Sequence, residues 1–169
     1  MSIELKQLST EDGEDVYDML QEIGTNEYGF MNEVKGMSFD EYKLWLKQED
    51  GYSRAENLPE NWVPGTTFFL FIDEIPVGIG RIRHYSNENL EQRGVGNFGY
   101  GIAKPYRNKG YGSILFEKLL MKCKTFGYSK IKLYAYIDNI ATNKIMLKNG
   151  AKLIGIFNGE KNIYEFSLY

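Results

Sequence analysis

A basic turn with two glycines is the part of the sequence whose residue types point most directly to chemistry. It reads Arg-Asn-Lys-Gly-Tyr-Gly over residues 107–112, between a predicted strand and a predicted amphipathic helix. A helix N-terminus exposes unpaired N–H groups and the positive end of the helix dipole, so it binds phosphate without a catalytic acid or base. Arg107 and Lys109 add positive charge, and Gly110 and Gly112 let an anion approach the backbone. The turn therefore predicts a phosphate or pyrophosphate site, with a simple tight turn as the alternative.

Two common nucleotide-binding motifs are missing or incomplete. The sequence has no Gly-x-x-x-x-Gly-Lys-Ser/Thr, and the six-residue glycine pattern of dinucleotide-binding folds is only partly present. These absences disfavour a nucleotide triphosphatase and a dinucleotide-dependent enzyme.

Few side chains offer acid, base or nucleophilic chemistry. His84 is the only histidine and has a suitable reference pKa of about 6.5, but a lone histidine forms no pair, triad or metal set, so a structural role is its alternative. Glu33 and Glu88, in predicted loops, are further candidates for a base. Cys123 falls on the apolar stripe of a predicted helix, which indicates a packing residue rather than a reactive thiol.

The elements that carry these residues predict an α/β (α+β) fold, with a mixed, mostly antiparallel twisted sheet of about six or seven strands and about four helices. The predicted strands are 3–8, 67–72, 77–85, 97–103, 131–137, 151–157 and 162–168. The predicted helices start near residues 12, 38, 112 and 139 and end before Gly24, Glu49, Gly127 and Gly150. The aromatic-rich connection 25–37 either lines a substrate site or is an ordinary loop, and 49–66 is predicted to be a surface excursion.

Composition limits the class of protein. With 169 residues, 43% of them hydrophobic and 15% aromatic, the chain suits one folded domain without disulfides. The absence of a signal-like start or a long apolar run predicts a soluble cytoplasmic protein with no membrane partner. Residues 1–60 contain 15 acidic and 5 basic residues, whereas the remainder contains 8 and 15. The two parts are expected either to meet ligands of opposite sign or to be solvated surfaces, and the net charge of −3 disfavours nucleic-acid binding.

The chain resembles the GNAT superfamily of acyl-CoA-dependent N-acetyltransferases. The family's glycine loop, Gln/Arg-x-x-Gly-x-Gly/Ala, is matched by Arg107, Gly110 and Gly112. The resemblance extends to Gly-Tyr-Gly-Ile-Ala-Lys-Pro at 99–105, to Asn-Ile-Ala-Thr-Asn-Lys at 139–144 and to the glycine turn at 148–151. The strand 81–84 and the Asn-Glu pair at 87–88 further resemble an uncharacterised bacterial subgroup. The resemblance covers most of the chain and implies a single GNAT-like domain over residues 1–169.

The resemblance also implies where acetyl-CoA binds. The pyrophosphate would be held beside Arg107 by backbone amides of Asn108, Lys109, Gly110, Tyr111, Gly112 and Ser113. The backbone of Ile102, Ala103 and Lys104 would pair with pantetheine, and an amide of that strand would stabilise the oxyanion formed at the thioester. Asn139 and Asn143 would lie beside pantetheine or its thiol end, with a helix cap as the alternative role of Asn139.

One position departs from the family pattern. Many members have a tyrosine four residues before the glycine that ends the second late helix, where it protonates the leaving thiolate, and this chain has Met146 there. Tyr134 and Tyr136, on one face of the preceding strand, are candidate replacements, with packing or surface roles as the alternative. Solvent is also a sufficient acid because a thiol has a reference pKa of about 8.5. The base is His84, Glu33, Glu88 or water.

The expected activity is direct transfer of an acetyl group from acetyl-CoA to a primary amine of a small molecule or peptide, without a covalent intermediate or a metal. The acidic N-terminal part would suit a cationic acceptor, such as a polyamine, an aminoglycoside or a lysine-like amine. A non-catalytic acyl-CoA-binding or sensing module is the alternative that Met146 favours. Dimers are common in the family, and the sequence itself indicates no oligomeric state.

Overall fold

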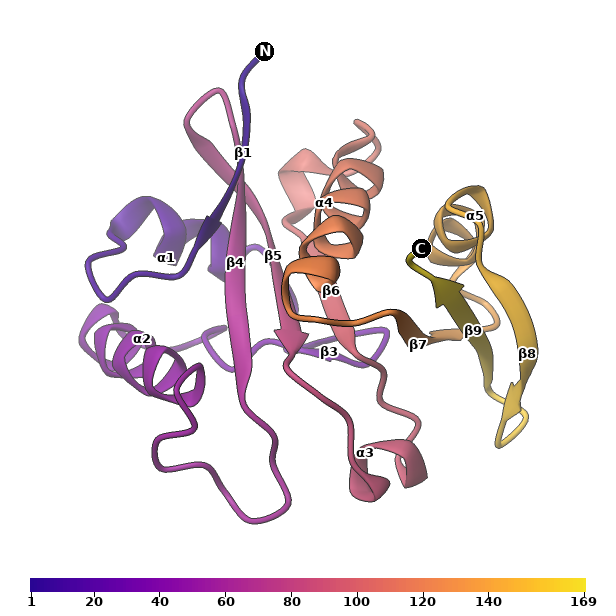
Figure 1. Cartoon of the computed structure of the whole chain (residues 1–169). Coiled ribbons are helices and arrows are strands. Elements are labelled where there is room, and N and C mark those ends of the chain that lie inside the picture. The colour runs from indigo at the N-terminus through magenta and orange to yellow at the C-terminus, as the bar shows by residue number, and fades with distance from the viewer.

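The computed structural model describes residues 1–169 and has the predicted α+β class, with helices flanking antiparallel sheets (Figure 1). One sheet has the order β1-β4-β5-β6 and comprises β1 (Ile3–Gln7), β4 (Gly65–Ile72), β5 (Ile75–Arg83) and β6 (Phe98–Ile102). A second has the order β7-β9-β8 and comprises β7 (Lys130–Tyr136), β8 (Lys152–Phe157) and β9 (Lys161–Ser167). The short strands β2 (Asn26–Glu27) and β3 (Phe30–Met31) form a separate hairpin.

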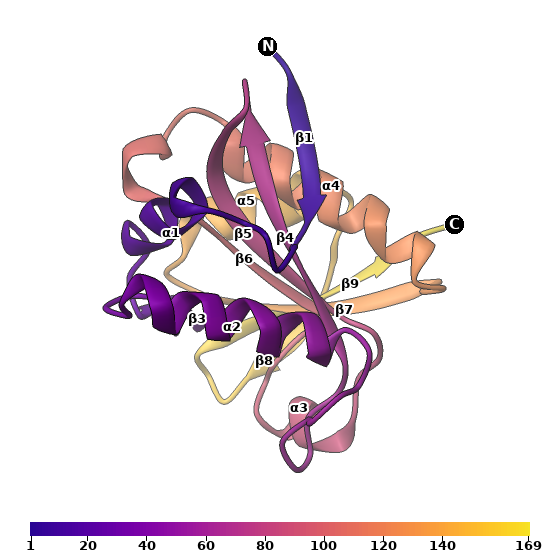
Figure 2. The same cartoon turned by 90° about the vertical axis from the view of Figure 1, so that its left-hand side faces the viewer.

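The helices cover the faces of these sheets. They are α1 (Glu14–Gln21), α2 (Phe39–Tyr52), α3 (Glu88–Gln92), α4 (Tyr111–Thr125) and α5 (Ile140–Lys148), with a 3-10 turn at Lys104–Tyr106. Figures 1 and 2 show α1 and α2 on one face of the four-stranded sheet and α4 on the other. None of these helices is both long enough and apolar enough to cross a bilayer.

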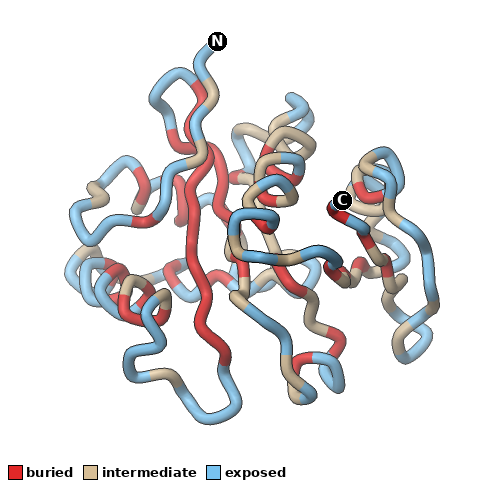
Figure 3. The backbone as a smooth tube through the Cα atoms, viewed as in Figure 1, coloured by how far each residue is buried: buried red, intermediate tan, exposed pale blue.

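β4 is the central strand between two hydrophobic cores. All eight of its residues are buried, which Figure 3 shows as a continuous red segment. Phe68 and Leu70 pack in the core beneath α4, whereas Phe69 and Phe71 pack in the core beneath α1 and α2. A strand covered on both faces needs apolar residues at successive positions, which explains the dense apolar run in the sequence.

Local signals set the ends of the helices. Ser38 caps α2 in a reciprocal capping box: its Oγ accepts from the Glu41 N–H at 3.2 Å, and its own N–H donates to Glu41 Oε1 at 3.0 Å. Gly127 and Gly150 follow α4 and α5 with φ values of +87° and +86°. These left-handed conformations favour glycine and explain why both residues predict the helix ends correctly.

Three local predictions need correction. α2 continues to Tyr52 because that side chain is buried, with its ring centroid 5.6 Å from that of Trp62. The predicted surface excursion therefore starts later and ends in buried residues at 63–66. The predicted loop 86–94 contains α3, which is capped by Asn87. This helix is too short to show helical periodicity in the sequence. The connection 25–37 contains the β2–β3 hairpin.

β6 and β7 meet at one end only. The Asn97 N–H donates to Lys132 O at 3.0 Å, and the Lys132 N–H donates to Asn97 Oδ1 at 2.7 Å. A Cβ on Gly96 would lie 2.7 Å from Lys132 O, so this close approach requires glycine. No sheet pairing joins the two strands further along, and each belongs to a different sheet. The edge of β6 that faces away from β5 is thereby left unpaired.

Candidate functional site

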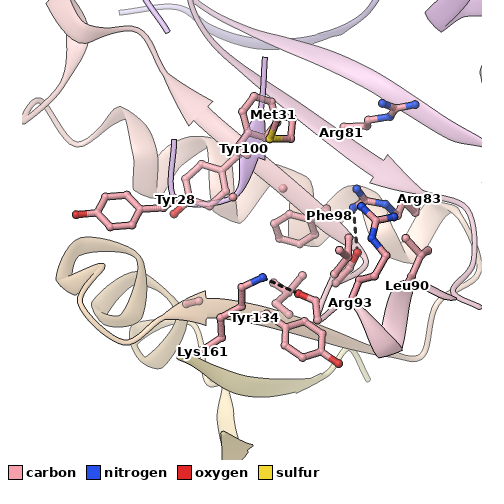
Figure 4. A pocket seen from close by; sticks show the side chains of 18 of the residues that line it. Tyr28, Met31, Arg81, Arg83, Leu90, Arg93, Phe98, Tyr100, Tyr134 and Lys161 are labelled. Atoms are coloured by element: carbon pink, nitrogen blue, oxygen red, sulfur yellow. Dashed lines mark hydrogen bonds between the residues drawn. The ribbon is translucent and has the colours of Figure 1, made fainter. Parts of the chain in front are cut away.

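A cavity of about 410 Å³ opens beside the unpaired edge of β6. Its lining comes from the β2–β3 hairpin, the segment 61–63 before β4, β5, α3 and the segment after it, β6, β7, α5 and the start of β9. Figure 4 shows Tyr28, Met31, Phe98 and Tyr100 among the side chains around this space. The aromatic connection 25–37 therefore lines the cavity, and its role in a substrate site stays a prediction.

The glycine turn forms the N-terminus of α4. Gly110 is the N-cap with φ +83°, and Asn108 is also left-handed at φ +61°. The Ile114 N–H donates to Gly110 O, so the preceding helical N–H groups of Tyr111, Gly112 and Ser113 have no partner from the helix's own turns. A Cβ placed on Gly110 would meet no atom within 4 Å. This helix end is thus open to an approaching anion.

Arg107 connects this turn to the cavity instead of pointing freely toward the helix end. Its Nε donates to Ile102 O at 2.9 Å, and its Nη2 lies 3.2 Å from Glu27 Oε1. The pKa of Glu27 is lowered first by the hydrogen bond from the Gly24 N–H and then by Arg107. Lys109 forms no ion pair and remains the free cation within the turn.

The backbone at the end of β6 is partly engaged. The Ala103 N–H donates to Val77 O at 3.0 Å, and the Lys104 N–H donates to Glu22 O at 3.1 Å. The alternation set by this register directs the N–H of Ile102 away from β5, together with those of Phe98 and Tyr100. Of Ile102, Ala103 and Lys104, only Ile102 therefore offers its amide at the unpaired edge.

The two predicted asparagines at α5 have different environments. Asn139 lines the cavity, and its Oδ1 accepts from the Thr142 N–H at 3.4 Å, which is the capping alternative. Asn143 Nδ2 donates to Tyr136 O at 2.9 Å and to Asn139 O at 2.8 Å, while its Oδ1 accepts from the Tyr164 hydroxyl at 2.6 Å. Asn143 thus holds the start of α5 against β7 and β9.

The tyrosines of β7 share one face, as their spacing predicts, and both line the cavity. The Tyr134 ring packs edge-on against Phe157, with centroids 5.7 Å apart. Lys161 Nζ lies 4.8 Å from the Tyr136 ring centroid. Met146 also lines the cavity and is buried in the core beneath α4.

Tyr100 was not singled out from the sequence. Its hydroxyl lies 3.0 Å from the Thr142 hydroxyl, one helical turn before Met146. Burial raises the pKa of Tyr100, so the phenol stays protonated at neutral pH. The Gly-Tyr-Gly stretch at 99–101 was the available signal, but nothing local to it predicts contact with α5.

The predicted acid–base candidates are separated by the fold. His84 does not line the cavity: its Nε2 lies 2.7 Å from Thr66 Oγ1, and its ring stacks on Phe126 at the end of α4. Burial lowers the pKa of His84. Glu88 is exposed on α3, where it accepts from Gln92 Nε2, whereas Glu33 lines the cavity. Cys123 is buried as predicted, and burial raises its pKa to about 12.

Arginines from β5 and from the end of α3 also line the cavity. Arg81 Nη2 lies 3.4 Å from Glu49 Oε2, and its guanidinium lies over the rings of Tyr52 and Trp62. Arg83 Nη1 donates to Gly96 O at 3.0 Å. Charged residues at alternate strand positions ordinarily indicate a solvated face, so the sequence offered no sign of this arrangement.

Ligating side chains are scattered in this structure. No group of three or more histidine, cysteine, aspartate or glutamate side chains is placed to hold a metal ion.

The chain is similar to known proteins over most of its length. The model of the Acetyltransferase (GNAT) family matches residues 31–151. No curated protein matches the chain. Among solved structures, the microcin C7 self-immunity acetyltransferase MccE, in complex with acetyl-CoA and AMP, has a TM-score of 0.70 at 17% identity, covering 98% of this chain and 92% of its own.

Two other solved structures have the same fold. An acetyltransferase from Salmonella typhimurium that modifies the N-terminal serine of ribosomal protein L7/L12 has a TM-score of 0.69 at 12% identity, covering 99% of this chain and 95% of its own. A spermidine N-acetyltransferase chimera from Vibrio cholerae and hSSAT has a TM-score of 0.65 at 17% identity, covering 99% and 96%. At these identities the likeness shows the fold.

Proposed function

Because the chain belongs to the acetyltransferase (GNAT) family, we propose that it transfers an acetyl group from acetyl-CoA to a primary amine of a small molecule or peptide. One observation carries this proposal: the unpaired amides at the N-terminus of α4 and the unpaired edge of β6 are adjacent. The open N-terminus of α4 lies beside Ile102, since a Cβ on Gly112 would be 3.9 Å from Ile102 Cγ1, and the free edge of β6 leads from Ile102 to the cavity.

These surfaces fit the chemistry of acetyl-CoA. The amides of Tyr111, Gly112 and Ser113 would hold the pyrophosphate, because they are unpaired and Gly110 keeps the space beside them open. The pantetheine amides would hydrogen-bond to the N–H and C=O groups on the free edge of β6. The register favours Phe98, Tyr100 and the N–H of Ile102 for this pairing, since Ile102 O already accepts from Arg107 Nε. The amides of Ala103 and Lys104 have protein partners.

The reaction needs one nucleophilic displacement. The amine nitrogen attacks the thioester carbonyl carbon, the carbon–sulfur bond breaks, and CoA leaves as a thiolate while the amine loses a proton. A backbone N–H on the β6 edge would stabilise the negative charge that develops on the carbonyl oxygen. A single donor of this kind contributes about 3 kcal/mol in comparable sites.

Tyr100 is the hydroxyl that we assign to the leaving thiolate. It lies on the β6 edge at the cavity, its raised pKa keeps it protonated, and its hydrogen bond to Thr142 holds it one turn from Met146. Tyr134 and Tyr136 remain alternatives because both line the cavity.

Water can remove the proton from the attacking amine, assisted by Glu33, the lining carboxylate that is not paired with Arg107. His84 and Glu88 are outside the cavity, and we assign neither of them to this step. Positioning of the two substrates would then supply most of the rate acceleration.

The test is turnover. Purified protein is mixed with acetyl-CoA and a panel of primary amines, thiol release is followed with a chromogenic reagent, and the acetylated amine is identified by mass spectrometry. We expect thiol release that depends on both substrates. Tight binding of CoA without thiol release from any amine would instead support the non-catalytic acyl-CoA-binding module, which the absence of a tyrosine at Met146 favours.

A further inference from the structure

One end of the cavity is strongly basic. The ionisable side chains of the lining, tyrosines aside, are the cations Arg81, Arg83, Arg93 and Lys161 and the carboxylates Glu27 and Glu33. Figure 4 shows Arg81, Arg83 and Arg93 together on the far side of Phe98 from Tyr28. The sign of this charge is opposite to that of residues 1–60, whose composition predicts a cationic acceptor.

Three of the four cations on the lining form no ion pair within the protein. Arg81 pairs with the buried Glu49, and Glu27 is occupied by Arg107. Arg83, Arg93 and Lys161 form no ion pair. We call these three residues the basic cluster.

Backbone carbonyls orient two members of the basic cluster without cancelling their charge. Arg83 Nη1 donates to Gly96 O at 3.0 Å, and Lys161 Nζ donates to Gly94 O at 3.2 Å. Both carbonyls belong to the segment that follows Arg93, so the loop after α3 contacts Arg83 and Lys161 and carries Arg93 itself. Arg93 makes no side-chain hydrogen bond to the protein, which leaves its whole guanidinium fork available to a ligand.

The cations also disfavour one another. The pKa of Arg83 falls to about 10, mainly through burial and further through the charges of Arg81 and Arg93. Burial lowers the pKa of Lys161; the nearby charge of Glu160 opposes this shift, and the charge of Arg93 adds to it. A bound anion would remove this mutual repulsion.

We propose that the amine acceptor also carries an anionic group, a carboxylate or a phosphate, that binds to Arg83, Arg93 and Lys161. This inference rests on the proposed function and specifies its acceptor. Guanidinium groups bind both anions through paired hydrogen bonds. Because Arg83 and Arg93 lie on the other side of Phe98 from Tyr100 (Figure 4), the amine and the anionic group occupy separate ends of the acceptor.

Matched amines test this proposal. Butylamine, 1,4-diaminobutane, 4-aminobutanoate and 3-aminopropylphosphonate have similar lengths and differ in the charge of the second end. We expect kcat/KM to be about tenfold or more higher for an anionic amine than for butylamine, with 1,4-diaminobutane the poorest substrate. The comparison of 4-aminobutanoate with 3-aminopropylphosphonate distinguishes a carboxylate acceptor from a phosphate acceptor.

Variants connect the selectivity to the basic cluster. R93Q removes an exposed side chain that has no protein partner, so the fold should persist. We expect the preference for the anionic amine over butylamine to fall about tenfold in R93Q and in R83Q. K152Q is the matched control, because Lys152 is an exposed cation on β8 that does not line the cavity. It should keep the wild-type preference.

The outcomes separate this inference from the proposed function. Acetylation that favours butylamine or 1,4-diaminobutane, with the same preference in R93Q, would overturn the anionic acceptor and leave the acetyltransferase activity standing. If no amine is acetylated, the proposed function fails, and thermal unfolding with CoA present tests the cluster by itself. In that case 3-aminopropylphosphonate or 4-aminobutanoate should raise the Tm of the wild type more than that of R93Q, and equal shifts would refute the site.

Discussion

The hydroxyl of Tyr100 on β6 lies 3.0 Å from the hydroxyl of Thr142 on α5. This contact links the four-stranded sheet to α5 across the cavity. No backbone pairing joins β6 to β7 there. It also brings a protonated phenol to within one helical turn of Met146, the position at which many family members have a tyrosine on the helix itself. The Tyr100 hydroxyl of β6 therefore lies near the helix position at which this chain has Met146 instead of a tyrosine.

Replacing Tyr100 with phenylalanine should lower kcat by about 100-fold, because proton donation to a leaving group contributes about that much or more. KM for acetyl-CoA should change little, and steady-state kinetics with thiol detection measures both parameters. Thr142→Val is the control, since it removes the same hydrogen bond and keeps the phenol. A Tyr100→Phe enzyme with wild-type kcat would remove Tyr100 from the mechanism.

Met146→Tyr provides a second check on the same step. The tyrosine would return a hydroxyl to the helix position, at a packing cost of about 1–3 kcal/mol because Met146 is buried. We expect it to restore part of the kcat lost in Tyr100→Phe. No recovery in a double variant that remains folded, as judged by circular dichroism, would argue against an interchangeable proton donor.

Gly112→Asp should abolish CoA binding while leaving the chain folded. The carboxylate would occupy the first turn of α4, where it stabilises the helix and repels a phosphate. Calorimetric titration with CoA measures the affinity. Gly112→Ala is the matched control, because a Cβ there meets only ordinary contacts at 3.7 and 3.9 Å. Gly110 is less suitable, since its φ of +83° would strain any replacement. Unchanged affinity in Gly112→Asp would refute the pyrophosphate assignment.

Folding stability should decrease as the pH falls below about 6.5, the reference pKa of histidine. Burial lowers the pKa of His84 in the folded state. As the pH falls, the unfolded chain therefore binds a proton before the folded protein does, and this binding stabilises the unfolded state relative to the folded one. The decrease can be at most about 1.4 kcal/mol per pH unit from one group. Urea unfolding between pH 5.5 and 7.5 measures it.

His84→Gln is the comparison for this pH effect. It should reduce the slope of stability against pH in this range, because His84 is the only histidine. The pH dependence of kcat/KM should stay the same, since His84 lies outside the cavity against Thr66 and Phe126. A change in that kinetic profile would return His84 to the list of catalytic bases.

Asn143→Ala should destabilise the fold by about 2–4 kcal/mol. The change leaves the Tyr164 hydroxyl and the Asn162 side-chain amide without their acceptor, Asn143 Oδ1. It also removes one of the two N–H donors from the carbonyls of Tyr136 and Asn139. Asn139→Ala removes one weak helix cap and should cost about 1 kcal/mol. Denaturant unfolding of both variants checks the order, and an equal or smaller loss for Asn143→Ala would contradict its structural role.

The sequence alone determined the features that depend on neighbouring residues. The capping box of Ser38 and Glu41, the helix ends at Gly127 and Gly150, and the turn before α4 arise from contacts a few residues apart. Such contacts leave recognisable patterns in the chain. The buried run of β4 and the apolar stripe that contains Cys123 likewise follow from strand and helix periodicity.

Only the tertiary structure decided which side chains share the cavity. Tyr100 and Thr142 are 42 residues apart, and Lys161 contacts the carbonyl of a glycine 67 residues away. Strand alternation places Arg83 and His84 on opposite faces, but it does not say which face borders a cavity and which is covered by α4. That choice depends on how the two sheets separate after Asn97 and on what packs against each face. The contents of the site are therefore a property of long-range packing.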